Sequence, residues 1–156
     1  MISLVALSLA FAASAGPCDL LDRAAAAQLL GAPVTSMDPS GPEPDEDTGA
    51  NRTTCTYMAG QAMLIVIRLD FPNAAAARDV TAAELEREKL AEQQATAKPE
   101  SGVGDKAYLI YNPRAAEYVV VKGASVLTLA LGGTKNPLPS YEAQLRSSAT
   151  AAAKKL

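Results

Sequence analysis

Residues 106–133, KAYLIYNPRAAEYVVVKGASVLTLALGG, decide the fold class of this chain. Three runs in it are rich in β-branched and aromatic residues, at 107–111, 117–122 and 126–131. The turn-forming pairs Asn112-Pro113 and Gly123-Ala124 separate the runs at hairpin spacing. The pattern therefore predicts a three-stranded antiparallel meander.

A second pair of strand-like runs lies upstream, at 54–59 and 63–71, with a turn at Gly60-Gln61. Alternation puts Leu64 and Val66 on one face of the second run. The other face is apolar along its whole length and holds Met63, Ile65, Ile67, Leu69 and Phe71. We expect this longer apolar face to be covered throughout, and the opposite face only at its start.

Three helices are expected around these strands. Asp19 can cap a helix over 20–30 that stops at Gly31, and Asn73 can cap a surface helix from 74 to about 94. Ser140 is expected to cap a last helix, whose apolar side holds Tyr141, Leu145, Ala149 and Ala152. The order α-β-β-α-β-β-β-α predicts an α+β fold, with helices packed on an antiparallel sheet of about five strands.

The segment 37–54 differs from the rest of the chain. It holds Pro39, Pro42 and Pro44, followed by the acidic run Asp45-Glu46-Asp47, and has hardly an apolar side chain. These residues are typical of turns and solvated segments. We expect a long exposed loop at 37–54 that Cys55 closes.

The N-terminal segment 1–15 is predicted to be a signal peptide. Residues 4–11 form an apolar run, and Ala13-Ser14-Ala15 follows as a small-x-small cleavage site. A short membrane anchor or a buried N-terminal helix is the alternative reading. No basic residue precedes the apolar run, so either the amino terminus alone supplies the positive charge or translation begins upstream. The 156-residue length then leaves one domain at 16–156, in the periplasm or outside the cell.

Two cysteines, Cys18 and Cys55, are the only thiols of the chain. In an exported protein without histidine, they favour a disulfide over a metal site. A lipid anchor is not expected, because Pro17 stands where a lipobox has Gly, Ala or Ser before the cysteine.

Several short motifs resemble a family of small exported bacterial domains of unknown function, many of them lipoproteins. They are Cys18-Asp19-Leu20-Leu21, Cys55-Thr56-Tyr57 and Gly102-Val103-Gly104-Asp105-Lys106-Ala107-Tyr108. The resemblance implies a helix at the first cysteine, a strand at the second and a final meander. It implies no activity, and Pro17 departs from the lipoprotein pattern.

The composition excludes several kinds of chemistry. The chain has no histidine, which rules out Ser-His-Asp and Cys-His catalysis. Gly102-Val103-Gly104 and Gly132-Gly133 lack the spacing of nucleotide-binding loops, and the acidic run at 45–47 lacks a calcium-loop pattern. The net charge of −3 with scattered basic residues argues against nucleic acid as a partner. We expect no metal, no cofactor and no membrane span after cleavage.

The sequence favours a non-enzymatic binding or interaction domain, with an envelope or extracellular protein or a small ligand as its partner. One alternative is an inhibitor of an exported hydrolase, and another is a carboxylate enzyme using Asp70 with Glu117. If the meander is regular, Tyr108 and Tyr111 point to opposite faces, so one lies away from the main core. The candidate partner-binding residues are Pro42, Asp45, Glu46, Asp47, Tyr108 and Tyr111.

Overall fold

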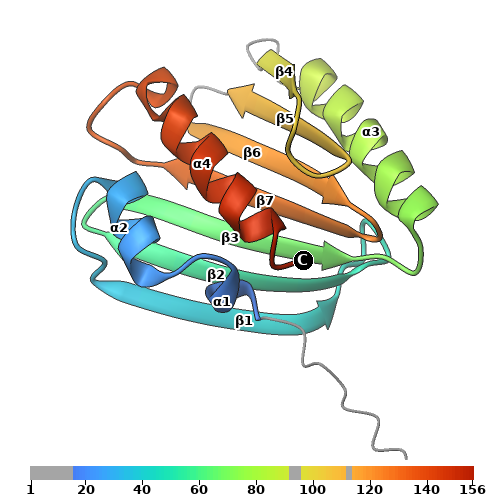
Figure 1. Cartoon of the computed structure of the whole chain (residues 1–156), viewed down its shortest axis with the longest axis horizontal. Helices are drawn as coiled ribbons and strands as arrows, with labels where there is room; N and C mark the ends of the chain where they lie inside the picture. Colours follow the sequence, from blue (N-terminus) through green and yellow to red (C-terminus); the bar gives the residue numbers. More distant parts are fainter. Residues whose placement is uncertain (1–15, 92–95, 112–113) are drawn as a thin grey trace, which may run out of the picture.

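The computed structural model describes residues 16–91, 96–111 and 114–156, and the predicted signal peptide lies outside them. The fold is one antiparallel sheet of seven strands in the order β1-β2-β3-β7-β6-β5-β4 (Figure 1). The strands are β1 (Ser36–Pro44), β2 (Asn51–Ala59), β3 (Ala62–Asp70), β4 (Thr96–Glu100), β5 (Lys106–Tyr111), β6 (Ala115–Lys122) and β7 (Ser125–Gly132). The helices are α1 (Pro17–Leu20), α2 (Arg23–Leu30), α3 (Ala74–Ala91) and α4 (Glu142–Ala153), with a 3₁₀ turn η1 (Leu138–Tyr141) before α4.

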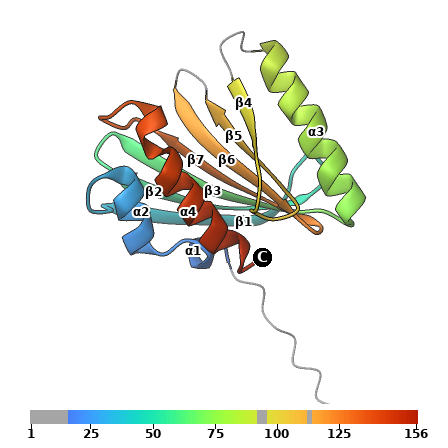
Figure 2. The ribbon, with the colours of Figure 1, turned by 45° about the horizontal axis from the view of Figure 1, so that its top comes forward.

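The helices cover the two faces of the sheet unequally. α1, α2 and α4 lie on one face, and α3 lies on the other, towards the β4 edge (Figures 1 and 2). The larger core is on the first face, where Leu29 of α2 and Leu145 of α4 pack with Leu64 and Leu129 of the sheet. A smaller core joins Ala77 and Leu85 of α3 to Val119 and Ile110. None of the described helices covers the part of the second face that β1, β2 and β3 form.

The prediction of about five strands, in the order α-β-β-α-β-β-β-α, was wrong, because the sheet has two further strands. The predicted loop at 37–54 forms β1, the turn after it and the start of β2, and β4 precedes the meander. Both additional strands are sheet edges, and every residue of β1 is exposed. An edge strand in water needs no apolar alternation, and proline is tolerated there because one side of the strand lacks a hydrogen-bonding neighbour. The sequence therefore did not predict these two strands, because β1 contains Pro39, Pro42 and Pro44 and β4 contains Pro99.

The predicted hairpin and meander are confirmed, but the covered face of β3 was predicted wrongly. Leu64 and Val66 are fully buried under the N-terminal helices, whereas Met63 on the longer apolar face is 37% exposed. Of that longer face, Phe71 at its end is buried in the smaller core. The placement of α2 and α4 decides which face of β3 is buried, and the number of apolar residues on a face does not.

Of the three predicted helix caps, only Asn73 is found. The single helix predicted over 20–30 is two helices in the structure. α1 ends at Leu20, and Asp22 caps α2 in place of Asp19, by accepting a hydrogen bond from the Ala25 N–H at 2.8 Å. The Asn73 cap is confirmed, since its side chain accepts from the Ala76 N–H at 2.9 Å. Ser140 does not cap α4, because it lies in η1 and donates to the Pro137 carbonyl.

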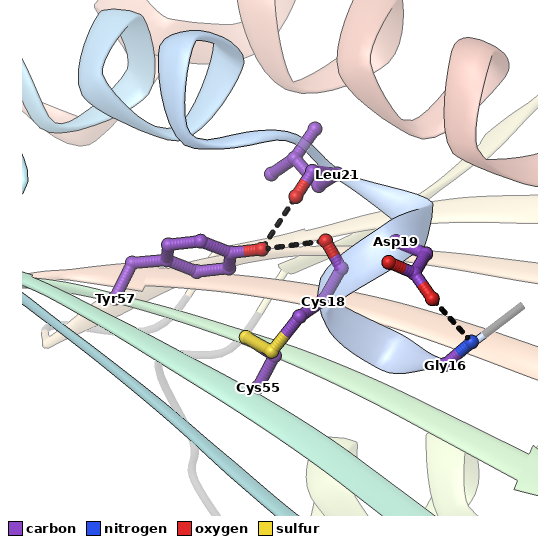
Figure 3. The surroundings of a disulfide bond; sticks show 6 residues. All are labelled: Gly16, Cys18, Asp19, Leu21, Cys55 and Tyr57. Carbon is purple, nitrogen blue, oxygen red and sulfur yellow. Dashed lines mark hydrogen bonds between the residues drawn. A yellow bond between two sulfur atoms is a disulfide. The ribbon is translucent and has the colours of Figure 1, made fainter.

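The predicted Cys18–Cys55 disulfide is present and ties α1 to β2 (Figure 3). Cys55 is fully buried in the larger core, and Cys18 packs against that core. None of the described helices is both long and apolar enough to cross a membrane.

Candidate functional site

Tyr57 fixes the N-terminal helices on the sheet beside the disulfide. It extends from β2 beneath α1, and its hydroxyl donates to the Cys18 carbonyl at 3.2 Å and to the Leu21 carbonyl (Figure 3). Burial raises the pKa of Tyr57 to about 12, and the carboxylates of Asp22 and Asp19 add to the shift. A fully buried phenol whose hydroxyl is hydrogen-bonded to two carbonyl groups holds the backbone in place and is not accessible to a ligand.

A large hollow lined by described residues lies at the end of the sheet where α2 ends, the β2–β3 hairpin turns and the chain leaves β7. We call it the end groove, and its volume is about 580 Å³, within the range of roughly 300–1,000 Å³ typical of small-molecule sites. Its lining residues are Leu30, Gly31, Ala32, Pro33, Thr35, Ala59, Gly60, Gln61, Ala62, Gly133, Lys135, Asn136 and Tyr141.

Glycines shape this end groove. Gly31 ends α2 in the left-handed conformation, with φ of 68°, and Pro33 prevents the helix from continuing. Gly133 also has a positive φ, of 67°, and a Cβ there would collide with the backbone carbonyl of Gln61. The chain leaving β7 can pass this close to the β2–β3 turn only because Gly133 has no side chain. These conformations bring three separate chain segments around one hollow.

The end groove presents polar side chains that the fold does not use. The side chains of Gln61, Lys135, Asn136 and Tyr141 line it and form no hydrogen bond or ion pair with the part of the chain that the structure describes. Tyr141 is only 7% exposed, and it lines the wall together with apolar Leu30. Among the described residues that line the groove, Lys135 is the only charged one. An apolar wall with a few converging polar groups is the usual form of a ligand site.

The acidic residues predicted to bind a partner form the tight turn between β1 and β2. Asp45 accepts hydrogen bonds from the N–H and hydroxyl of Thr48, at 3.0 and 2.7 Å, and lies 3.6 Å from Arg52. The hydrogen bond from the Thr48 hydroxyl is the main cause that lowers the pKa of Asp45. Asp45 thus shapes the turn, while Pro42, Glu46 and Asp47 are exposed around it.

Tyr108 and Tyr111 lie on opposite faces, as predicted, and both are half-buried. Tyr108 packs against the smaller core, and Tyr111 packs against the larger one. The Tyr111 hydroxyl donates to Glu142 at 3.3 Å, and Lys98 of β4 donates to the same carboxylate at 2.7 Å. Burial raises the pKa of Tyr111, and the Lys98 hydrogen bond lowers the pKa of Glu142. Tyr111 therefore helps to attach α4 to the β4 edge.

A carboxylate beneath α4 completes this attachment. The side chain of Glu100 is 4% exposed and pairs with Arg146 at 2.9 Å and with Lys98 at 3.3 Å. The Tyr118 hydroxyl is buried nearby without a hydrogen-bond partner among the described residues, and burial raises its pKa. The two oxygens of the buried carboxylate face cations from β4 and α4, so these ion pairs join that helix to the edge strand.

The remaining motifs hold the fold together. The N–H of Asp105 donates to the Val121 carbonyl at 2.8 Å, and its carboxylate accepts from the Gly123 N–H at 2.7 Å. The glycine motif at 102–104 thus leads into a clamp on the β6–β7 hairpin. Asp70 and Glu117 do not come together: Asp70 bonds Arg68 and Ser125 at the end of β3, and Glu117 lines a small hollow under α3. No cluster of three possible metal-ligating residues occurs within 16–91, 96–111 and 114–156.

The end groove was missed at the sequence level. Its residues come from segments up to 111 positions apart (Leu30 to Tyr141), and its charged residue, Lys135, ends the motif Gly132-Gly133-Thr134-Lys135, whose pattern indicates only a turn. The available signal was the set of turn glycines, Gly31, Gly60 and Gly133, which mark chain reversals. Which reversals meet at the same end of the sheet depends on strand order, and β7 lies beside β3 only because the meander folds back.

Comparisons with known proteins show the fold alone. No family model matches the chain, and no curated protein sequence matches it. Among solved structures, the chain is similar to the extracellular domain of PknH from Mycobacterium tuberculosis. The TM-score is 0.59 at 12% sequence identity, over 87% of this chain and 92% of that domain.

Proposed function

We propose that this protein is an exported, non-enzymatic binding domain and that the end groove is its ligand site. The observation that carries the proposal is the groove itself, a hollow of about 580 Å³ with one apolar wall and four polar side chains that form no hydrogen bond or ion pair with described residues. In most of the other motifs, the polar groups are engaged in hydrogen bonds or ion pairs within the fold. The four polar side chains of the groove are available for a ligand.

Export is supported by three features of different kinds. The segment 1–15 has the pattern of a signal peptide, Cys18 and Cys55 are bonded, and the fold is shared with an extracellular domain. Disulfides of this kind persist in oxidising compartments. We place the protein in the periplasm or outside the cell on these grounds.

The inhibitor alternative loses the feature that motivated it. That alternative presented either the long loop at 37–54, tethered at Cys55, or an exposed tyrosine to the target enzyme, and the tethered loop was the feature that favoured it. The segment is instead paired along β2, and only the short turn after Pro44 projects from the sheet. The acidic turn remains a competing contact site, so the test compares it directly with the end groove.

The test is a fragment screen observed by NMR on the ¹⁵N-labelled domain. We expect fragment binding to shift amide signals of the end groove, such as those of Gly31, Gln61 and Asn136. Gln61→Trp should fill the groove and abolish these shifts, because Gln61 is exposed and a larger side chain there has room to cover the opening. Glu46→Trp, on the exposed acidic turn, is the matched control and should leave them unchanged. Shifts confined to the acidic turn, or none at all, would contradict the proposal.

A further inference from the structure

We infer that the end groove recognises a carboxylate next to an amide N–H and an apolar side chain, which is the chemistry of an N-acylated amino acid or of the last residue of a peptide. This inference rests on the proposed function and adds the class of ligand. It follows from how charge, donors, acceptors and apolar surface are distributed around the groove.

The loop after β7 supplies the positive side of the groove. Lys135 carries its only charge among the described lining residues, and that charge is not neutralised, because Lys135 has no ion-pair partner in the described chain. Asn136 and Gln61 add amide donors, and Tyr141 adds a hydroxyl. No carboxylate from the described part of the chain lines the hollow, although the sequence holds 17 acidic residues. A carboxylate is the ligand group that such donors favour.

The end of α2 supplies the opposite chemistry. A helix leaves its last carbonyl groups without intrahelical donors, and α2 ends at Leu30 with Gly31 and Pro33 following. The Gly31 N–H satisfies the Gln28 carbonyl at 3.3 Å, and Pro33 has no N–H to offer another. Leu30, Gly31, Ala32 and Pro33 line this side of the groove, where a carbonyl group left without an intrahelical donor would favour an N–H donor of the ligand.

The apolar part of the lining lies between the two polar sides. Leu30, Ala59, Ala62 and the ring of Tyr141 line the hollow, and each of these residues is buried. An aliphatic side chain on the ligand would cover this surface and lose contact with water. A carboxylate, an amide N–H and an aliphatic side chain all occur in one N-acylated amino acid.

The test measures the affinity of two probes by NMR titration, N-acetyl-leucine and its primary amide, N-acetyl-leucinamide. They differ only in the carboxylate. Because the Lys135 ammonium is partly exposed, we expect the acid to bind about threefold to fivefold more tightly than the amide. This advantage should shrink as salt is added, since the pair is open to solvent.

Two variants of the same type locate the charge. Lys135→Gln should lower the affinity for the acid to that for the amide, without changing the affinity for the amide. The control is Lys154→Gln, which removes the same charge at the C-terminal end of α4, outside the end groove. It should change neither the affinity for the acid nor that for the amide. A tripeptide ending in leucine, with a free C-terminus, distinguishes the sources: tighter binding than N-acetyl-leucine indicates a peptide end, and equal binding indicates a small N-acylated amino acid.

The outcomes separate this inference from the proposed function. If fragments bind in the end groove but the acid has no advantage over the amide, or Lys135→Gln has no effect, the ligand class is wrong and the binding site stands. If no fragment binds in the end groove, the proposed function is wrong and this inference with it.

Discussion

Single side chains determine how the N-terminal helices are held, and Tyr57 is the clearest case. Its ring is fully buried in the larger core, and its hydroxyl reaches the carbonyl groups of Cys18 in α1 and of Leu21 in the link to α2. The disulfide fixes the same segment from Cys18. A covalent bond and a buried phenol thus act together on a helix of only four residues, which has little stability of its own.

Replacing Tyr57→Phe should lower the free energy of unfolding by about 1–3 kcal/mol, because the Cys18 and Leu21 carbonyls lose their donor. The loss should depend on pH. A phenol titrates near 10 in the unfolded chain, and the pKa of Tyr57 is raised to about 12 in the fold. Its contribution is therefore fully present below pH 10 and is lost as the pH rises from about 10 to 12.

Urea unfolding at neutral pH and between about pH 10 and 12 measures this effect. The difference between the native protein and the Tyr57→Phe variant should narrow across the alkaline window. Tyr108→Phe is the matched control, since the Tyr108 hydroxyl makes no hydrogen bond to a described residue. A difference that stays constant up to pH 12 would contradict the assigned role.

At the scale of elements, short connections hold the sheet and helices in register. The loop between β4 and β5 crosses the β6–β7 hairpin, and Asp105 bonds the hairpin through both its N–H and its carboxylate. The loop can lie this close only because Gly104 has no side chain. A Cβ at Gly104 would lie 2.5 Å from a methyl group of Val120 and 2.6 Å from the Val121 carbonyl.

Two alanine substitutions in this loop should differ in their cost. Gly102→Ala and Gly104→Ala both place a side chain at a positive φ, of 80° and 60°, which costs about 1 kcal/mol. A Cβ at Gly102 meets nothing within 4 Å, whereas Gly104→Ala also forces a collision in a packed region, worth about 1–3 kcal/mol more. Thermal and urea unfolding of both variants measures the difference. Equal destabilisation would show that the loop is not pressed against β6.

At the scale of the whole molecule, the two ends of the described chain meet away from the end groove. The Lys155 ammonium donates to the Asp19 carbonyl at 2.8 Å, so the C-terminus lies beside α1 (Figure 1). The end groove lies at the other end of the sheet, where α2 ends. The end groove and the contact between the two ends of the described chain therefore lie at different ends of the sheet.

We expect the exported protein to begin at Gly16, after the site Ala13-Ser14-Ala15. The Gly16 nitrogen lies 3.0 Å from an Asp19 carboxylate oxygen, so an amino terminus created there would gain a charge-assisted contact. Intact-mass measurement of protein from the periplasm or medium checks the start. Ala15→Pro should block processing and keep residues 1–15. Exported material that still carries Met1 would refute the assignment.

The sequence by itself determined the β2–β3 hairpin, the meander, the disulfide and two helix ends, at Gly31 and Asn73, because alternation, turn residues and caps act within a few positions. Only the tertiary structure decided the rest. β1 and β4 are strands because neighbouring strands supply their hydrogen bonds. The residues of these proline-containing edge strands show no strand pattern of their own. The buried face of β3 was chosen by the helices that land on it, against the larger number of apolar residues on the other face. The end groove exists because three turns, far apart in the chain, meet at one end of a sheet whose strand order no local pattern records.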